Sequence, residues 1–312
     1  MIYNLEWMLM NLGEGGMFQK YAVSVPRMHK LQSLVTWGLK NTKILFQMLH
    51  RLPNLEKLTL AGSSMKRIWT PESLISHEKI GVMQLKELEL LQLWCLEEIG
   101  FEHDSLLQSI ERLVIVECLK LINLASTSIS FTSLTYLEVS DCSGLRNLMT
   151  SSSAKSLIQL TTMKISFCPM MVEIIEENEE EKVEEIEFRQ LKVLELVSLQ
   201  NLTSFCSSDK CDLKFRLLEN LVVSGCFKMS KFSKVHKAPN LQKIHVVAGE
   251  KDKWYWEGDL NGTLQKMITY KVCIRVFIFH FIQNIFFFLN FLQLGNNVLQ
   301  NIQRKGNQVS AK

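Results

Sequence analysis

A single apolar phrase recurs along most of this chain of 312 residues. Its pattern, L-x-x-L-x-(L/V/I)-x-x-(C/L)-x-x-L-x-x-(L/I), can be placed at least seven times between Leu52 and Val246. The sixth residue of each copy serves as an anchor, and successive anchors lie 23 to 31 residues apart. A period of this length indicates one small structural unit that stacks on copies of itself. The anchors are Leu60, Leu90, Ile115, Val139, Ile165, Leu196, Val223 and Val246.

The phrase and its period predict a leucine-rich-repeat solenoid of the α/β class. Each repeat supplies one short strand and a return segment, so the stacked strands form a parallel sheet on the concave face of a curved horseshoe. The convex side is expected to be irregular or to carry short helices. A fainter copy of the phrase at 31–45 places the first repeat near residue 28. We therefore expect a ragged N-terminal segment at 1–27 and a domain of about eight to nine repeats at 28–270.

The alternation of side chains along a strand predicts which residues are buried. Residues on either side of the variable fifth position share one face of the strand, and these leucines are expected to point into the coil. The ninth position carries Asn or Cys in such repeats, because the turn after the strand contains backbone groups that need partners. Four cysteines at this position predict a buried structural ladder, and Leu93 and Leu199 replace them in two other coils. The four are Cys118, Cys142, Cys168 and Cys226.

Positions three, five, seven and eight of the phrase are predicted to face outward on the concave side. Tyr136 and Phe167 are candidate anchors for a partner, because aromatic side chains on a rigid platform often dominate interfaces. The alternative is that the charged residues pair across adjacent strands and the aromatic residues are isolated surface residues. In three central coils the candidate partner-binding residues are Arg112, Val114, Val116, Glu117, Tyr136, Glu138, Ser140, Asp141, Thr162, Lys164, Ser166 and Phe167.

The chain shows none of the common sequence signatures of catalysis. It has no phosphate-binding glycine loop, no H-E-x-x-H and no G-x-S-x-G. Cys206 and Cys211 lack the second pair of Cys or His ligands that a structural zinc site requires. The 35 basic and 32 acidic residues leave a formal charge of +3, which does not favour a nucleic-acid partner. We therefore predict a non-enzymatic chain without a cofactor or metal.

An acidic run of nine glutamates, EIIEENEEEKVEEIE, spans residues 173–187. It falls inside the longest step between anchors, the 31 residues from Ile165 to Leu196. The sequence predicts a solvated loop or short helix on the return side of one coil, since runs of like charge usually mark solvated surfaces. A docking patch for a basic partner is the alternative.

The residues after Tyr270 have a different character. The stretch 276–294 is apolar and aromatic and is long enough to cross a bilayer, although His280 and four amide side chains interrupt it. Three interpretations stay open: a transmembrane anchor, a helix that caps the solenoid, or residues foreign to the ancestral domain. The last is favoured because the change is abrupt and no repeat period continues. We expect residues 271–312 to form an apolar helical tail followed by a polar end, which does not belong to the repeat domain.

Four stretches carry a family resemblance: HRLPNLEKLTL at 50–60, LKELELLQLWCLEEIGFEH at 85–103, LTYLEVSDCSGLRNLMTSSSAKSLIQL at 134–160 and KWYWEGDLNGTLQKM at 253–267. Their alternation of C-x-x-L and L-x-x-L coils resembles the C-terminal leucine-rich repeats of plant coiled-coil, nucleotide-binding disease-resistance proteins, over about residues 28–270. The resemblance implies a recognition module that binds a pathogen effector, a host target or an autoinhibited nucleotide-binding domain. The nucleotide-binding loop of that family is not found in this sequence, so nucleotide switching is not carried over.

Two other functions remain as alternatives. The first is the substrate-recognition arm of a ubiquitin ligase. Such an arm would need an F-box-like helical segment at its N-terminus, and residues 1–27 are too short and too often interrupted by glycine to form one. The second is a membrane-anchored leucine-rich-repeat receptor held by 276–294. No signal peptide follows Met1, so we expect a cytoplasmic protein, with membrane association only through 276–294. The glycosylation sequons at Asn201 and Asn261 are then expected to be unused.

Overall fold

The computed structural model describes eleven segments of the chain. They contain most of the predicted repeats, whereas 276–294 and the rest of the tail lie outside the described residues. The described segments are 6–10, 31–40, 45, 49, 52–68, 85–99, 109–124, 130–176, 184–207, 211–245 and 254–269.

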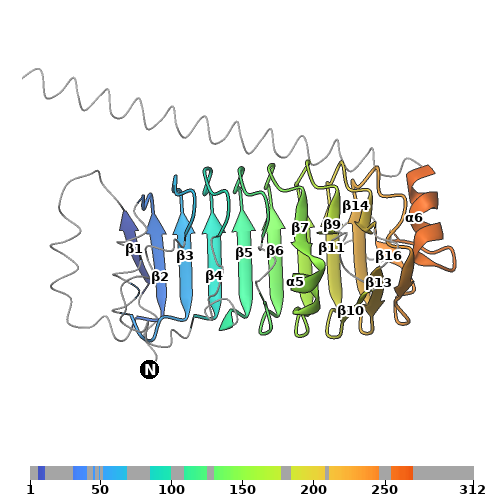
Figure 1. Cartoon of the computed structure of the whole chain (residues 1–312), viewed down its shortest axis with the longest axis horizontal. Coiled ribbons are helices and arrows are strands. Elements are labelled where there is room, and N and C mark those ends of the chain that lie inside the picture. Colours follow the sequence, from blue (N-terminus) through green and yellow to red (C-terminus); the bar gives the residue numbers. More distant parts are fainter. Residues whose placement is uncertain are drawn as a thin grey trace, which may run out of the picture.

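The main feature is an eleven-stranded sheet that runs the length of the molecule (Figure 1). Each strand pairs in parallel with the strand of the next coil, except that β17 is antiparallel to β16. The predicted parallel sheet of a leucine-rich-repeat solenoid is thus confirmed. The strands in order are β1 (Glu6–Met10), β2 (Ser33–Trp37), β3 (Lys57–Ala61), β4 (Glu87–Leu91), β5 (Arg112–Val116), β6 (Tyr136–Ser140), β8 (Thr162–Ser166), β11 (Val193–Val197), β14 (Asn220–Ser224), β16 (Ile244–His245) and β17 (Trp254–Tyr255).

The register of the sheet follows the phrase without a slip. The anchor Ile115 lies opposite Leu90 on one side and Val139 on the other, and Leu137 lies between Leu113 and Met163. All of these side chains are fully buried. Because a slip of one residue would turn every apolar side chain to the solvent face, this burial fixes the pairing of the strands. The predicted inward positions are therefore confirmed.

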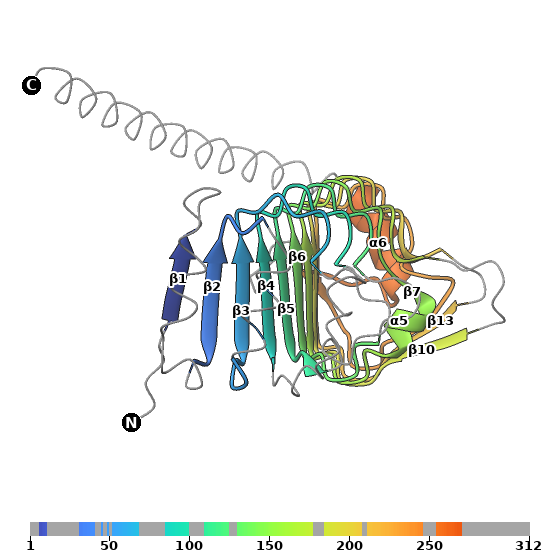
Figure 2. The same cartoon turned by 60° about the vertical axis from the view of Figure 1, so that its left-hand side comes forward.

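Among the described residues, the convex side carries the short helix α5 and two small parallel sheets, which lie across the core from the main sheet (Figure 2). Helix α5 begins after Thr150, whose hydroxyl accepts a hydrogen bond from the backbone N–H of Ser153 at 3.3 Å. Short return strands thus replace much of the irregular structure that the sequence favoured. The convex elements are β7 (Asn147–Thr150), α5 (Ser151–Lys155), β9 (Glu173–Glu176) and β12 (Ser204–Cys206), then β10 (Glu184–Phe188), β13 (Cys211–Phe215) and β15 (Val235–Lys237).

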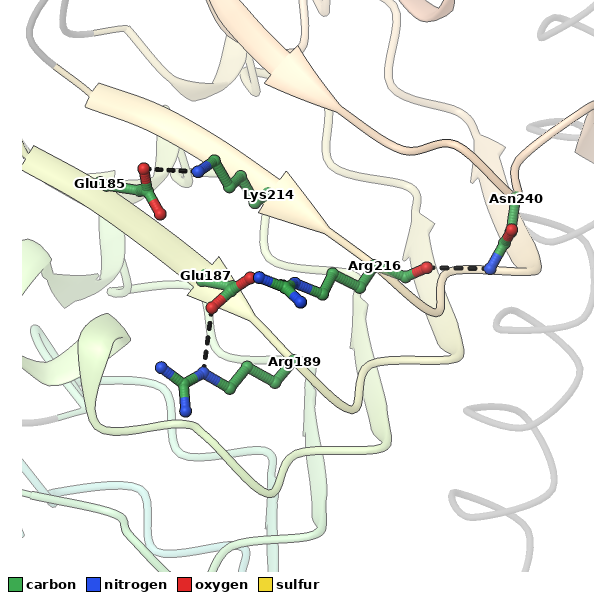
Figure 3. A network of polar contacts seen from close by, with 6 residues as sticks. All are labelled: Glu185, Glu187, Arg189, Lys214, Arg216 and Asn240. Carbon is green, nitrogen blue, oxygen red and sulfur yellow. Dashed lines mark hydrogen bonds and ion pairs between the residues drawn. The ribbon is translucent and has the colours of Figure 1, made fainter.

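The interpretation of 173–187 as a loop or short helix was wrong at both of its ends. Strands β9 and β10 occupy them, and residues 177–183 lie outside the described residues. The reason is visible in the pattern, since Ile174, Ile175, Ile186 and Phe188 are buried between the glutamates. Glu185 of β10 pairs with Lys214 on β13, and Glu187 pairs with Arg189 and Arg216 in the turns that follow the two strands (Figure 3).

Helix α6, Leu260–Thr269, closes the C-terminal end of the core. Leu260, Leu264 and Met267 are buried against it. The Asn261 side chain accepts a hydrogen bond from the Phe232 backbone N–H at 2.7 Å and donates one to the Ser233 carbonyl at 3.0 Å. The sequon at Asn261 therefore has a structural use. Within the described part of the chain, no helix has the length and apolar character to cross a membrane.

Candidate protein-interaction surface

A ladder of left-handed residues defines one edge of the concave face. The residue at position eight, which follows each strand, has a positive φ near 55° where it is not glycine. Its backbone N–H donates to the position-seven carbonyl of the next coil, as from Glu117 to Ser140 at 3.0 Å. Glycine adopts this conformation at little cost, and Gly38, Gly62 and Gly225 use it in the outer coils. Five central coils place side chains there instead: Gln92, Glu117, Asp141, Phe167 and Ser198.

The predicted cysteine ladder lies directly behind this edge. Cys118, Cys142, Cys168 and Cys226 are buried, as predicted. Each thiol donates to the carbonyl two residues earlier, at 3.3 Å in Cys142 and Cys168. The side-chain hydrogen bond that Cys168 makes with Cys142, together with burial, raises the pKa of the Cys168 thiol well above its usual range. Burial and these hydrogen bonds fit the predicted structural role in the turn, and we expect all four thiols to be unreactive in the folded protein.

The candidate residues of the three central coils lie where the register predicts, in rows across β5, β6 and β8. Position three forms a row of Arg112, Tyr136 and Thr162, and position five continues from Val114 through Glu138 to Lys164. Val114 is the exception in exposure, because only 8% of its surface is accessible. The other eleven side chains are half-buried and reach the surface.

Tyr136 is held in place on both sides. The Arg112 guanidinium carbon lies 3.7 Å from the centroid of the Tyr136 ring, and the Tyr136 hydroxyl donates to Glu138 at 2.5 Å. Burial raises the pKa of this hydroxyl, and the Glu138 carboxylate raises it further. A cation over an aromatic face contributes about 0.5–1 kcal/mol at exposed sites. The tyrosine is therefore a fixed platform whose orientation is set before any partner arrives.

Other charges on the sheet pair across neighbouring strands. The Lys164 ammonium lies 3.1 Å from the Glu195 carboxylate, and the Lys57 ammonium lies 2.8 Å from the Glu89 carboxylate. The alternative of cross-strand pairing thus holds for Lys164, although its partner comes from β11. Such exposed pairs contribute about 0–1 kcal/mol each. Sequence reasoning confined to three coils missed Glu195 and Glu89, yet the same position-five register would have located both.

Two carboxylates on the left-handed edge have no cation beside them among the described residues. Glu117 accepts a hydrogen bond from the Gln92 amide at 3.0 Å, and Asp141 lies in the next coil. Burial raises the pKa of Asp141, and the negative charge of Glu117 raises it further. This edge of the concave face therefore carries an excess of negative charge, which is complementary to a cationic group.

Trp37 is a further exposed aromatic residue that the repeat pattern alone did not single out. Its indole, 46% exposed, lies on the backbone of Gly62, so closely that a Cβ added to this glycine would be 2.6 Å from the ring. It occupies position seven of the first predicted coil, in the same row as Val116 and Ser140. Among the described residues, no group of three or more His, Cys, Asp or Glu side chains could hold a metal ion.

Part of the chain is similar in sequence to a known family of repeats. Residues 123–248 match the family model of plant disease resistance protein RPS2-like leucine-rich repeats. Among solved structures, the leucine-rich repeat domain of the type III effector XCV3220 (XopL) aligns at 15% identity and a TM-score of 0.36, covering 80% of this chain and 78% of that one. A search of curated proteins found no match. The resemblance to the leucine-rich repeats of plant disease-resistance proteins is therefore confirmed over residues 123–248.

Proposed function

We propose that this chain is a non-enzymatic recognition module of plant immune-receptor type, which acts in defence by binding another protein through its concave face. Leucine-rich repeats of this family are protein-interaction modules in general. The partner is a pathogen effector, a host target or an autoinhibited nucleotide-binding domain. We place the protein in the cytoplasm, because the cysteines in the described part of the chain form no disulfide, and cysteines stay reduced in that compartment.

One observation carries the proposal. The central coils present a fixed aromatic residue, Tyr136, between an arginine and a carboxylate, with Phe167 and the unbalanced Asp141 on the neighbouring edge. Interface hot spots are enriched in tyrosine and arginine, and they work best when they are pre-organised. A rigid, mixed surface of this kind favours a protein partner.

The test replaces both aromatic residues together. Tyr136→Ala with Phe167→Ala is expected to weaken association with a co-expressed nucleotide-binding domain or host candidate at least tenfold, with little change in melting temperature. The matched control is Ile158→Ala, which removes an exposed apolar side chain away from the concave sheet. If the double variant folds and associates like the unsubstituted chain, the concave face is not the contact surface.

A further inference from the structure

A second apolar surface lies outside the concave sheet, on the turns that follow the strands. These turns form the upper edge of the molecule in Figure 1. Five large apolar side chains are exposed there, from 40% in Val172 to 54% in Ile122. They occupy positions ten, eleven and thirteen of the phrase, where the repeat does not require apolar residues. We name this group the rim surface: Trp94, Leu119, Ile122, Met170 and Val172, with the cations Lys120 and Arg146.

The rim surface is continuous because the turns stack in register. The backbone N–H of Ile122 donates to the Glu97 carbonyl at 3.2 Å, and that of Val172 donates to the Arg146 carbonyl at 2.8 Å. The Ser143 hydroxyl also donates to the Leu119 carbonyl at 3.3 Å. Four consecutive coils therefore contribute to one strip. Three steps of about 4.8 Å give a length of roughly 14 Å, or between two and three turns of an α-helix.

The charges available on this strip are positive. Lys120 and Arg146 are exposed, and neither side chain makes a hydrogen bond or an ion pair with another described residue. Two carboxylates in the same turns are already engaged, since Glu97 lies 3.4 Å from the Lys66 ammonium and Glu173 accepts a hydrogen bond from the Ser207 hydroxyl at 2.7 Å. The carboxylates of Glu117 and Asp141 lie on the left-handed edge of the concave face, before position ten of the phrase. Exposed apolar patches rimmed by polar residues mark interaction sites.

We propose that the rim surface docks an acidic amphipathic helix of a partner protein. The apolar side of that helix would cover Trp94, Ile122 and Val172, and its carboxylates would pair with Lys120 and Arg146. An amphipathic helix laid along an apolar surface is a common mode of recognition. An anionic membrane is the less suitable occupant, because two cations are fewer than the four to eight that mark lipid-binding segments. This surface is separate from the concave face and does not depend on its function.

The probe is a fluorescent model helix of leucine and glutamate with one apolar face, and its counterpart carries lysine for every glutamate. Fluorescence anisotropy with the full chain is expected to show at least tenfold tighter binding of the acidic helix. Both Lys120→Glu with Arg146→Glu and Trp94→Ser with Ile122→Ser should weaken that binding at least tenfold. The variant Tyr136→Ala with Phe167→Ala should bind the helix like the unsubstituted chain. Because the four side chains substituted in the two rim variants are exposed, the melting temperatures of these variants should match that of the unsubstituted chain.

Several results would overturn the proposal. These are equal binding of the two helices, no measurable binding of the acidic helix, or unaltered binding by both rim variants. Rim-dependent capture by vesicles of phosphatidylserine and phosphatidylcholine, without binding of the acidic helix, would identify a membrane surface in its place.

Discussion

The concave and convex sides of each coil are built under different constraints. On the concave side every coil supplies a strand in one unbroken register, because the spacing inside the phrase does not vary. On the convex side the described return segments form a helix and two three-stranded sheets, and the distance between anchors ranges from 23 to 31 residues. A fixed spacing thus gives a regular surface, while a variable spacing leaves each return segment to find its own packing.

The interior shows the same division. Leucine, isoleucine and valine fill the concave half of the coils, whereas four stacked phenylalanines fill the convex half near the C-terminal end. The ring centroids of stacked Phe188 and Phe215 are 5.2 Å apart, and those of stacked Phe205 and Phe232 are 4.8 Å apart. The two stacked pairs meet each other edge to face.

The largest difference between the two sides should appear in thiol labelling. Cys142 and the other ladder cysteines should react only when the whole domain unfolds, at least about a thousandfold more slowly than half-buried Cys95. Cys206 ends β12 and Cys211 begins β13 on the convex side, and both should react at intermediate rates. Peptide mapping by mass spectrometry after timed labelling measures each site. Labelling of the ladder as fast as Cys95 would show that the concave layer is not the stable one.

The second largest effect should be the loss of folding stability when one inward-facing leucine is truncated. Leu137→Ala empties a fully buried site on β6 and is expected to lower the free energy of unfolding by about 2–5 kcal/mol. Ile122→Ala is the matched control, because its side chain is 54% exposed and should change stability by less than about 0.5 kcal/mol. Equal urea midpoints for the two variants would contradict the assigned register.

A smaller and pH-dependent effect is expected at Asp141. Its pKa is raised in the folded state, so ionisation costs stability as the pH rises through the interval between the ordinary Asp value and the raised one. Asp141→Asn should therefore be more stable at neutral pH, and the pH-dependent part of that gain should vanish below the ordinary pKa. Melting temperatures at several pH values test the sign. A gain that grows as the pH falls would refute the cause.

The smallest change in stability is expected when a charge on the convex surface is removed. Glu187 lies 3.0 Å from the Arg189 guanidinium and also pairs with Arg216 (Figure 3), but both arginines are largely exposed. Solvent and salt screen such pairs. Glu187→Gln should shift the melting temperature least of these variants, and about 0.5 M salt should abolish even that shift. A large loss of stability would mean that β10 depends on its charges more than on buried Ile186 and Phe188.

The residues that the phrase constrains were predictable from the sequence. Apolar positions such as Leu137, the cysteine ladder and the rows that contain Tyr136 and Lys164 all follow from a period of two within the strand. The return strands were not predictable, because the glutamates of 173–187 hid the short apolar pairs at Ile174 and Ile186. Local charge indicated a loop, and burial in the tertiary structure outweighed it.

Side-chain partners on the concave face also escaped the sequence. The register shows that Lys164 has neighbours on both sides, Glu138 and Glu195, but only the structure shows that it pairs with Glu195. The contact between Arg112 and Tyr136 likewise depends on side-chain rotamers, which no spacing rule supplies. The limits predicted for the repeat domain and the partner-binding role of the twelve residues stay predictions.

The concave face is expected to be the surface that contacts the partner protein. A photo-crosslinking amino acid at Ser140, on β6 of that face, is compared with one at Asp212, an equally half-buried position on convex strand β13. With a nucleotide-binding domain of a plant disease-resistance protein co-expressed, crosslinks are expected from position 140 and not from position 212. Crosslinks from position 212 alone, or from neither position while the two proteins still co-purify, would show that the concave face is not the contact surface.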